Sequence, residues 1–510
     1  MQPRYHSAAS ALLACLLAGS TANARAAERL GFSVTLDRAV AEQALPAQEG
    51  RRAVSGRLYV FLSQRDGEPM QGPNWFRPEP FFAVDVRDVE PGATRIVDDA
   101  ADGFPDAMSK LPAGKFRVQA MLDHDFYAQN HARGVGNFYS DTAEFSIDPA
   151  TPAMRDLTLN KIVTADPFPE SAWVREIVLP SKLLGQFFGR EVLERATVVL
   201  PAGYDEHPHR RYPVIYQIPG FGGSHRPSSQ YRSAAPQAAE GETDFIRVLL
   251  SGQCKWGHHV YADSDTNGPR GTALVQEMIP HIDAAFRTVP QASGRFVTGH
   301  SSGGWSSLWL QVNYPDTFGG CWSTSPDPVD LRDFQQVDLY ADPPLSLYFD
   351  PHGQRRPIAR RGSEPTLWYE SFGKMDDVLG RGGQLRSFEA VFSPLGSDGL
   401  PRRLWDRRTG QIDPAVAKTW EKYDIRLLLQ RRWPHLGPKL AGKLHIITGE
   451  LDTFYLDGAV RKLSETLTEL GSDATVEIQP GRGHSDILTA QLAHRIRREM
   501  SERFRAAQGE

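Results

Sequence analysis

The chain has 510 residues, of which 40% are apolar and 23% are charged. This is the composition of a globular protein, and the length predicts more than one domain. The formal net charge of −5 gives no electrostatic reason to expect a nucleic acid or an anionic membrane as a partner, and it favours small or neutral substrates.

The N-terminal segment, residues 1–26, has the pattern of a signal peptide. An apolar run extends from Ala8 to Ala18, and small residues follow it up to Ala26. We expect cleavage near Ala24 or Ala26, and therefore a periplasmic or secreted protein. A buried N-terminal helix is the alternative, but the run has no amphipathic period. No later run reaches the roughly 18 apolar residues of a membrane span, so stable membrane insertion is not expected.

Residues 27–165 are expected to form an all-β domain. Short apolar or alternating runs are separated by turn residues, and helical periodicity is nearly absent. This pattern predicts an antiparallel sandwich of the immunoglobulin-like type, followed by a linker at 165–170. The predicted strands are 32–36, 56–63, 80–86, 92–97, 115–121, 142–147 and 155–163.

Residues 166–510 change to an alternation of strands and helices. A hairpin over 173–201 is followed by short apolar strands, with amphipathic helical patterns between several of them. Such alternation predicts an α/β fold with a mostly parallel, doubly wound sheet covered on both faces. The predicted strands are 213–218, 247–252, 295–299, 320–325, 443–449 and 475–480, and the predicted helices are 272–287, 304–314, 456–470 and 487–504.

The region at about 327–440 interrupts this alternation. It is too long for a structureless loop, so we expect a partly helical insertion or lid. Its aromatic side chains could line an aromatic or sugar pocket, or could form the insertion's own core, and core packing is the favoured interpretation. These side chains are Trp368, Tyr369, Phe372, Trp405 and Trp420.

A turn between a predicted strand and a predicted helix carries a candidate nucleophile. Gly299-His-Ser-Ser-Gly303 fits the pattern G-x-S-x-G with Ser301 at its centre. In such a turn the central hydroxyl projects above the sheet, and the backbone N–H of the next residue, Ser302, points at a developing oxyanion. The alternative is a glycine-rich turn without a catalytic role. The presence or absence of the other catalytic residues distinguishes the two interpretations.

A serine hydroxyl needs a base to accept its proton and an acid to orient that base. In this architecture the acid and then the histidine follow the serine, each after a later strand. The turn after 443–449 offers Glu450, Asp452 and Asp457, and the turn after 475–480 offers His484. We predict His484 as the base and Asp452 as the acid.

The turn after the strand 213–218 is glycine-rich and supplies a second candidate oxyanion donor. It reads Pro219-Gly-Phe-Gly-Gly223, and the predicted donor is the backbone N–H of Phe221. A plain turn is the alternative. A phosphate-binding loop is excluded, because no Gly-Lys-Ser/Thr follows.

These motifs together resemble the putative-esterase (esterase D-like) family of α/β-hydrolases, which includes S-formylglutathione hydrolase, feruloyl and acetyl-xylan esterases, enterochelin esterases and mycolyltransferases. The resemblance covers about residues 190–326 and 440–505, with the motifs "TGHSSGG", "GELDTFY" and "GRGH" in order. It implies catalytic roles for Ser301, Asp452 and His484. The chain departs from the family in Pro219, where many members have His or Asp, and in its long insertion.

The sequence therefore predicts an exported serine esterase that acts through an acyl-enzyme, without a metal or an organic cofactor. Its expected partner is a small-molecule or polysaccharide-linked ester, and no nucleic acid. Acyl transfer to an alcohol or a sugar is an alternative, because the same site serves whenever an acceptor outcompetes water. A non-catalytic binding protein on a hydrolase scaffold is another. The sequence leaves the particular ester and the oligomeric state open.

Overall fold

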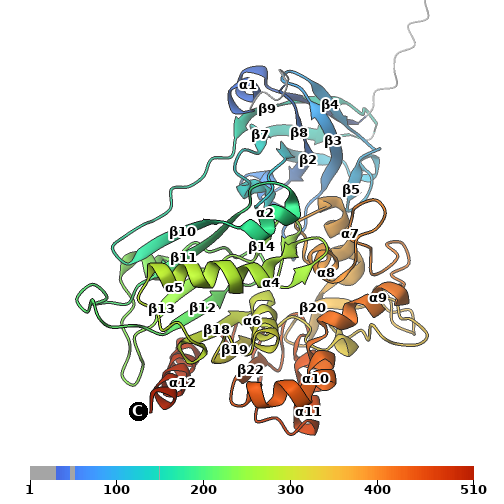
Figure 1. Cartoon of the computed structure of the whole chain (residues 1–510). Helices are drawn as coiled ribbons and strands as arrows, with labels where there is room; N and C mark the ends of the chain where they lie inside the picture. Colours follow the sequence, from blue (N-terminus) through green and yellow to red (C-terminus); the bar gives the residue numbers. More distant parts are fainter. Residues whose placement is uncertain (1–29, 46–51, 149, 510) are drawn as a thin grey trace, which may run out of the picture.

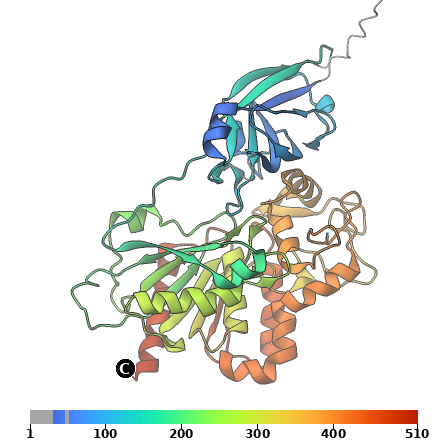
Figure 2. The ribbon, with the colours of Figure 1, turned by 45° about the horizontal axis from the view of Figure 1, so that its top comes forward.

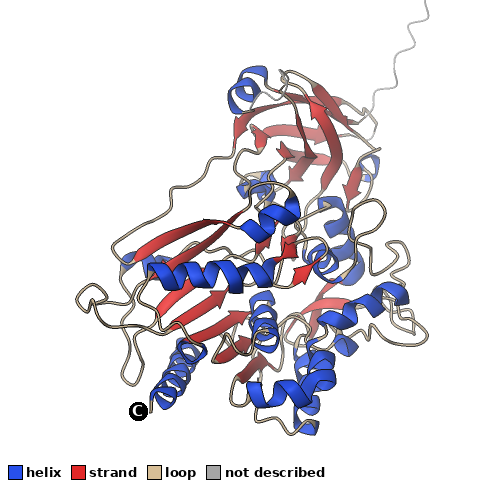
Figure 3. Ribbon diagram, viewed as in Figure 1, coloured by secondary structure: helices blue, strands red, loops and turns tan. Residues whose placement is uncertain are grey.

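The computed structural model describes residues 30–45, 52–148 and 150–509, so the predicted signal peptide at 1–26 lies outside the described residues. An N-terminal domain composed mainly of strands stacks on one end of a larger α/β unit (Figures 1 and 2). Figure 3 shows the same division by secondary structure, with strands concentrated in the N-terminal part and a helix-covered sheet in the remainder.

The N-terminal domain contains nine strands within the described ranges, joined in the order β4-β1-β9-β7-β6-β2-β3-β5, with β8 paired to β6. The β1–β9 pair is parallel. The sequence predicts seven of these strands and misses β5 and β7, which have only three residues each and leave no pattern. An immunoglobulin-like arrangement stays a prediction. The strands are β1 (Gly31–Leu36), β2 (Val54–Ser63), β3 (Phe81–Val89), β4 (Thr94–Val97), β5 (Asp102–Phe104), β6 (Gly114–Asp123), β7 (Phe138–Ser140), β8 (Ala143–Ile147) and β9 (Met154–Ile162), and a short helix α1 (Arg38–Ala44) follows β1.

Strand β2 is buried on both faces. Because successive side chains of a strand point to opposite faces, Leu58, Val60 and Leu62 enter the domain's own core. Tyr59 and Phe61 point the other way and belong to a second core that continues into the α/β unit. This face of the domain is therefore packed against the α/β unit.

The α/β unit is built on a sheet for which the described chain provides eight strands, in the order β10-β11-β13-β12-β18-β19-β22-β23. Strands β10, β11 and β13 pair antiparallel, and the pairs from β13 to β23 are parallel. The predicted α/β fold with a mostly parallel sheet is confirmed. The strands are β10 (Val174–Pro180), β11 (Leu193–Val199), β12 (Val214–Ile218), β13 (Ile246–Leu250), β18 (Arg295–His300), β19 (Gly320–Thr324), β22 (Leu444–Gly449) and β23 (Thr475–Gln479).

Helices cover both faces of this sheet, because its strands are apolar on both sides. In β12, Tyr216 enters the core on the face of α5 and α6, whereas Ile215 packs with Met500 of α12 on the opposite face. The described helices include none that is long and apolar enough to span a membrane. The helices are α2 (Lys182–Phe188), α3 (Ser229–Ser233), α4 (Arg270–Ala273) continued by the π-helical turn Leu274–Met278 into α5 (Ile279–Ala285), α6 (Ser302–Asn313), α11 (Asp457–Glu469) and α12 (Ala490–Gln508).

The segment between β19 and β22 forms a partly helical insertion at the carboxyl end of the sheet (Figure 1). Tyr369, Trp405 and Trp420 are almost fully buried and form its core, in agreement with the favoured interpretation of its aromatic residues. Its elements are β20 (Pro357–Arg361), β21 (Glu364–Trp368), α7 (Tyr369–Leu379), α8 (Gln384–Phe392), α9 (Pro414–Trp420) and α10 (Ile425–Leu440).

Candidate active site

Ser301 occupies a strained turn between β18 and α6. Its backbone has φ 60° and ψ −125°, a conformation that a residue with a side chain rarely adopts and that often marks a functional site. Glycine is required at both flanking positions, because a side chain there would not fit. A Cβ on Gly299 would lie 2.1 Å from the carbonyl oxygen of Gly303, and a Cβ on Gly303 would lie 2.2 Å from that of Ile218. The turn thus places Ser301 at the wall of a cavity above the sheet.

Asp452 and His484 form a buried pair at the ends of β22 and β23. The Nδ1 atom of His484 lies 2.7 Å from Oδ2 of Asp452. Burial alone would raise the pKa of Asp452, but the charge of His484 and hydrogen bonds from His484 and from the Phe454 and Leu456 amides hold it below its ordinary value. An ionised Asp452 accepts a hydrogen bond from the Nδ1–H group of His484, which leaves the Nε2 lone pair of His484 free to act as a base.

The other two acids near this turn have different partners. Glu450 accepts a hydrogen bond from the amide of Gly481 at 2.9 Å. Asp457 opens α11 and pairs with Arg360 at 2.8 Å. Of the three acids that the sequence offers, Asp452 is the one bonded to His484.

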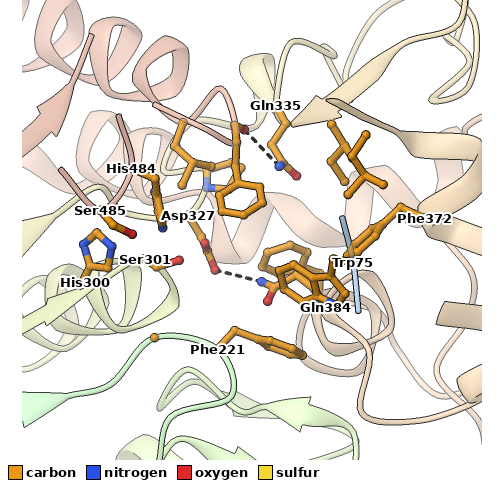
Figure 4. A pocket seen from close by; sticks show the side chains of 17 residues that line it. Trp75, Phe221, His300, Ser301, Asp327, Gln335, Phe372, Gln384, His484 and Ser485 are labelled. Carbon is orange, nitrogen blue, oxygen red and sulfur yellow. Dashed lines mark hydrogen bonds between the residues drawn. The ribbon is translucent and has the colours of Figure 1, made fainter. Parts of the chain in front are cut away.

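The imidazole of His484 is held between two rings. His300 lies on one side with its ring centroid 4.5 Å away, and Phe454 stands edge-on at 5.0 Å and 86°. Burial and the neighbouring charge of His484 lower the pKa of His300 to about 3, so His300 is neutral at physiological pH. Ser301 and His484 line the same cavity (Figure 4). No hydrogen bond joins their side chains in the described chain, and catalytic hydrogen bonds of this kind often tighten only when substrate binds.

The two predicted oxyanion donors flank the serine. A Cβ on Gly220 would lie 3.3 Å from Cβ of Ser301, which shows how closely the glycine-rich turn after β12 approaches the nucleophile. Phe221 follows in that turn, and Ser302 is the first residue of α6, where backbone N–H groups have no partner within the helix. Within the described residues, neither N–H has a protein acceptor.

Asp327 is a site residue that the sequence reasoning missed. It lies beyond the end of β19, is buried, and its Oδ2 accepts a hydrogen bond from the Ser302 hydroxyl at 2.5 Å. The amide of Gln384 reaches the same oxygen at 3.4 Å (Figure 4). Burial raises the pKa of Asp327 to about 6, against hydrogen bonds from Ser302 and Ser301 that favour the carboxylate. The sequence signal for Asp327 is its position just after a parallel strand, which is the same signal that identified Asp452.

These residues surround a cavity of about 240 Å³ with mostly apolar walls. The walls come from three parts of the chain, namely the α/β core, the insertion and a loop of the N-terminal domain that carries Trp75. Gln335 and Gln384 add amide groups, and in Figure 4 Trp75 and Phe372 lie together on the side away from Ser301. The apolar lining consists of Trp75, Phe221, Pro328, Ile358, Leu367, Phe372, Phe388, Phe454 and Leu456.

A strained serine between a parallel strand and a helix, followed by an aspartate and a histidine after the last two strands, is the arrangement of an α/β-hydrolase. A family model described as "Putative esterase" matches residues 193–469, more than half of the chain, and the chain belongs to that family. The resemblance inferred from the motifs is thereby confirmed.

Individual relatives match less of the chain. Esterase Rv1288 from Mycobacterium tuberculosis (strain ATCC 25618 / H37Rv) is 29% identical over 150 residues, which are 28% of this chain and 32% of the relative. The match thus spans about a third of this curated relative. An S-formylglutathione hydrolase from Agrobacterium tumefaciens is 15% identical, with a TM-score of 0.40 over 66% of this chain and 98% of its own. A ferulic acid esterase is 12% identical, with a TM-score of 0.40 over 65% of this chain and 98% of its own.

Proposed function

We propose that the protein is an exported serine esterase that hydrolyses carboxylic esters through an acyl-enzyme. The observation that carries this proposal is the buried Asp452–His484 pair, which opens onto the same cavity as a serine in a strained strand–helix turn. Membership of the esterase family supports the reaction class. The signal-peptide pattern of residues 1–26 supports export.

The reaction proceeds in two halves. In the first, Oγ of Ser301 attacks the ester carbonyl carbon while Nε2 of His484 accepts the hydroxyl proton. The backbone N–H groups of Phe221 and Ser302 stabilise the oxyanion of the tetrahedral intermediate. The intermediate then collapses, the bond to the alcohol oxygen breaks, and His484 donates its proton to the leaving alcohol.

In the second half, His484 removes a proton from water, and the hydroxide attacks the acyl carbon. The second tetrahedral intermediate uses the same oxyanion donors. Its collapse returns the proton from His484 to Oγ of Ser301 and releases the carboxylic acid. The Nδ1 proton stays on His484 throughout, and Asp452 accepts its hydrogen bond and stabilises the imidazolium that forms twice in each cycle.

The cavity favours esters with a compact apolar group. Its volume of about 240 Å³ and its aromatic and aliphatic walls are suited to such a group, and the amides of Gln335 and Gln384 offer hydrogen bonds to a polar substituent. A small-molecule ester or an ester carried by a polysaccharide meets this requirement.

The test compares the wild type with Ser301→Ala and Ser302→Ala on p-nitrophenyl esters from acetate to octanoate, with a fluorophosphonate probe as a second readout. We expect the wild type to turn over esters and to be labelled, and Ser301→Ala to lose both. Ser302→Ala keeps the backbone N–H that serves the oxyanion, so it is expected to be labelled. A Ser301→Ala variant that is still labelled, or a wild type inert to both reagents, would contradict the proposal.

A further inference from the structure

We infer that the N-terminal domain is part of the substrate site, and that Trp75 is a specificity-determining residue which limits the size of the group bound in the cavity. This inference rests on the ester hydrolysis proposed above. Trp75 is a residue of the β-domain that lines a cavity otherwise formed by the α/β core and the insertion.

Trp75 contacts each of the other walls. Its ring lies 5.1 Å from Phe372 of α7 and almost perpendicular to it, at 88°. It lies 5.6 Å from Phe221 in the oxyanion turn and 6.1 Å from Phe454 in the turn that carries the acid. The indole thus closes the cavity between the insertion and the turns that carry Phe221 and Phe454. A substrate group that is bound beside Ser301 and points toward α7 would contact this indole.

Two sets of hydrogen bonds support the loop that carries Trp75. The side-chain Oδ1 of Asn74 accepts hydrogen bonds from the amides of Phe76 and Arg77, each at 3.0 Å. Glu79 accepts hydrogen bonds from the hydroxyl of Ser63 and from the amide of Gln64, each at 2.8 Å. These bonds support the loop around Trp75, so a hydrogen-bonded turn presents the indole to the cavity.

The β-domain also fixes the end of helix α7, whose side chain Phe372 faces Trp75. The last carbonyl groups of a helix have no partner within it. Here the guanidinium of Arg57 donates to the carbonyl of Val378 at 2.9 and 3.1 Å, and the hydroxyl of Tyr59 donates to that of Leu379 at 2.6 Å. Both donors belong to β2 and are buried.

The turn after α7 is tied to the same domain. Arg381 donates to the carboxylate and carbonyl of Asp123 at 3.1 Å and to the carbonyl of Asp125 at 3.0 Å. Gln129 donates to the carbonyl of Gly382 at 2.8 Å. Gln384, the first residue of α8, then reaches the hydroxyl of Ser302 at 3.3 Å. The β-domain is therefore connected to Ser302, the residue after the proposed nucleophile, through hydrogen bonds of a short corner of the insertion.

The test measures kcat/KM for p-nitrophenyl acetate, butyrate, hexanoate and octanoate with the wild type, Trp75→Ala and Trp75→Phe. Trp433→Ala is the matched control, because Trp433 is a partly buried tryptophan on α10 outside the cavity lining. The labelling rate with a small fluorophosphonate reports whether the serine is still activated. Phenylalanine keeps an aromatic wall, so it provides a readout if the alanine variant fails to fold.

We expect Trp75→Ala to raise the octanoate-to-acetate ratio of kcat/KM by about tenfold or more, as a change of several methylene groups in an apolar pocket does. Trp75→Phe should give a smaller rise, and Trp433→Ala none. Trp433→Ala should be labelled at the wild-type rate, and both Trp75 variants should still be labelled, because Ser301, Asp452 and His484 are intact in them.

The inference is overturned if Trp75 variants that are folded and still labelled keep the wild-type chain-length profile. It is also overturned if Trp433→Ala shifts the profile as much as Trp75→Ala does. A wild type that neither turns over esters nor reacts with the probe would instead refute the proposed function itself, and with it this inference.

Discussion

Replacing Asp327 with asparagine is expected to remove a pH-dependent loss of stability. Asp327 is buried beside Ser302, and burial raises its pKa to about 6, whereas an ordinary aspartate has a value of 3.8. Nearby charges act in both directions, since His484 lowers this pKa and Asp452 raises it. The carboxyl group therefore keeps its proton in the folded state over a pH range in which the unfolded chain has lost it.

The sign follows from proton linkage. Below pH 3.8 Asp327 is protonated in both the folded and the unfolded state, and its contribution to the free energy of unfolding is most favourable there. Between pH 3.8 and about 6 the native state binds more protons than the unfolded state, so stability falls as pH rises, and above that range the loss is complete. A shift of about two pKa units corresponds to about 3 kcal/mol in the free energy of unfolding.

The assay is chemical denaturation of the wild type and of Asp327→Asn at pH 4, 5, 6, 7 and 8. Asparagine keeps an oxygen that can accept the hydrogen bond from Ser302 but carries no charge. The variant should gain stability relative to the wild type as pH rises, up to about 3 kcal/mol at pH 8. A difference that stays constant from pH 4 to pH 8 would show that Asp327 does not titrate in this range.

Three further predictions follow from the site and its supports. Asp452→Asn should lower kcat by about 10⁴-fold, because the histidine tautomer is lost; an effect below tenfold on p-nitrophenyl butyrate would argue against Asp452 as the acid. Gly303→Ala should abolish fluorophosphonate labelling, since its Cβ would lie 2.2 Å from the carbonyl oxygen of Ile218, whereas Gly353→Ala, which strains a backbone with φ 77° but meets no atom within 4 Å, should still be labelled. Tyr59→Phe should lower the free energy of unfolding by about 1–3 kcal/mol, because the carbonyl of Leu379 loses its donor; equal denaturation midpoints would contradict this.

The sequence was most informative where local chemistry and chain order coincide. Ser301, Asp452 and His484 each follow a short apolar strand, and parallel strands bring their carboxyl ends to one edge of the sheet. The position of each residue along the chain thus implied its position in space. The alternation of strands and helices predicts a mostly parallel sheet without knowledge of any long-range contact.

Residues placed by long-range packing could not be predicted in this way. Trp75 lies in an irregular loop of another domain, and nothing in its neighbourhood indicates that it faces a cavity whose other lining residues begin only at Gly220. The aromatic residues of the insertion show the same limit. Trp405 and Trp420 enter its core, while Phe372 lines the cavity. The sequence does not distinguish these two roles, because the role of Phe372 depends on how α7 is oriented.

The composition of β2 explains why the orientation of α7 depends on the β-domain. A strand with one face toward solvent alternates apolar and polar residues, whereas Leu58 to Leu62 are apolar on both faces. The outward-facing Tyr59 and Phe61 are buried at 1% and 2% exposure in a core shared with the insertion and the α/β sheet. The N-terminal domain and the α/β unit, which are divided near residue 165 in the sequence, therefore share one hydrophobic core. The cavity beside Ser301 is complete only when both are folded, because Trp75 forms part of its wall.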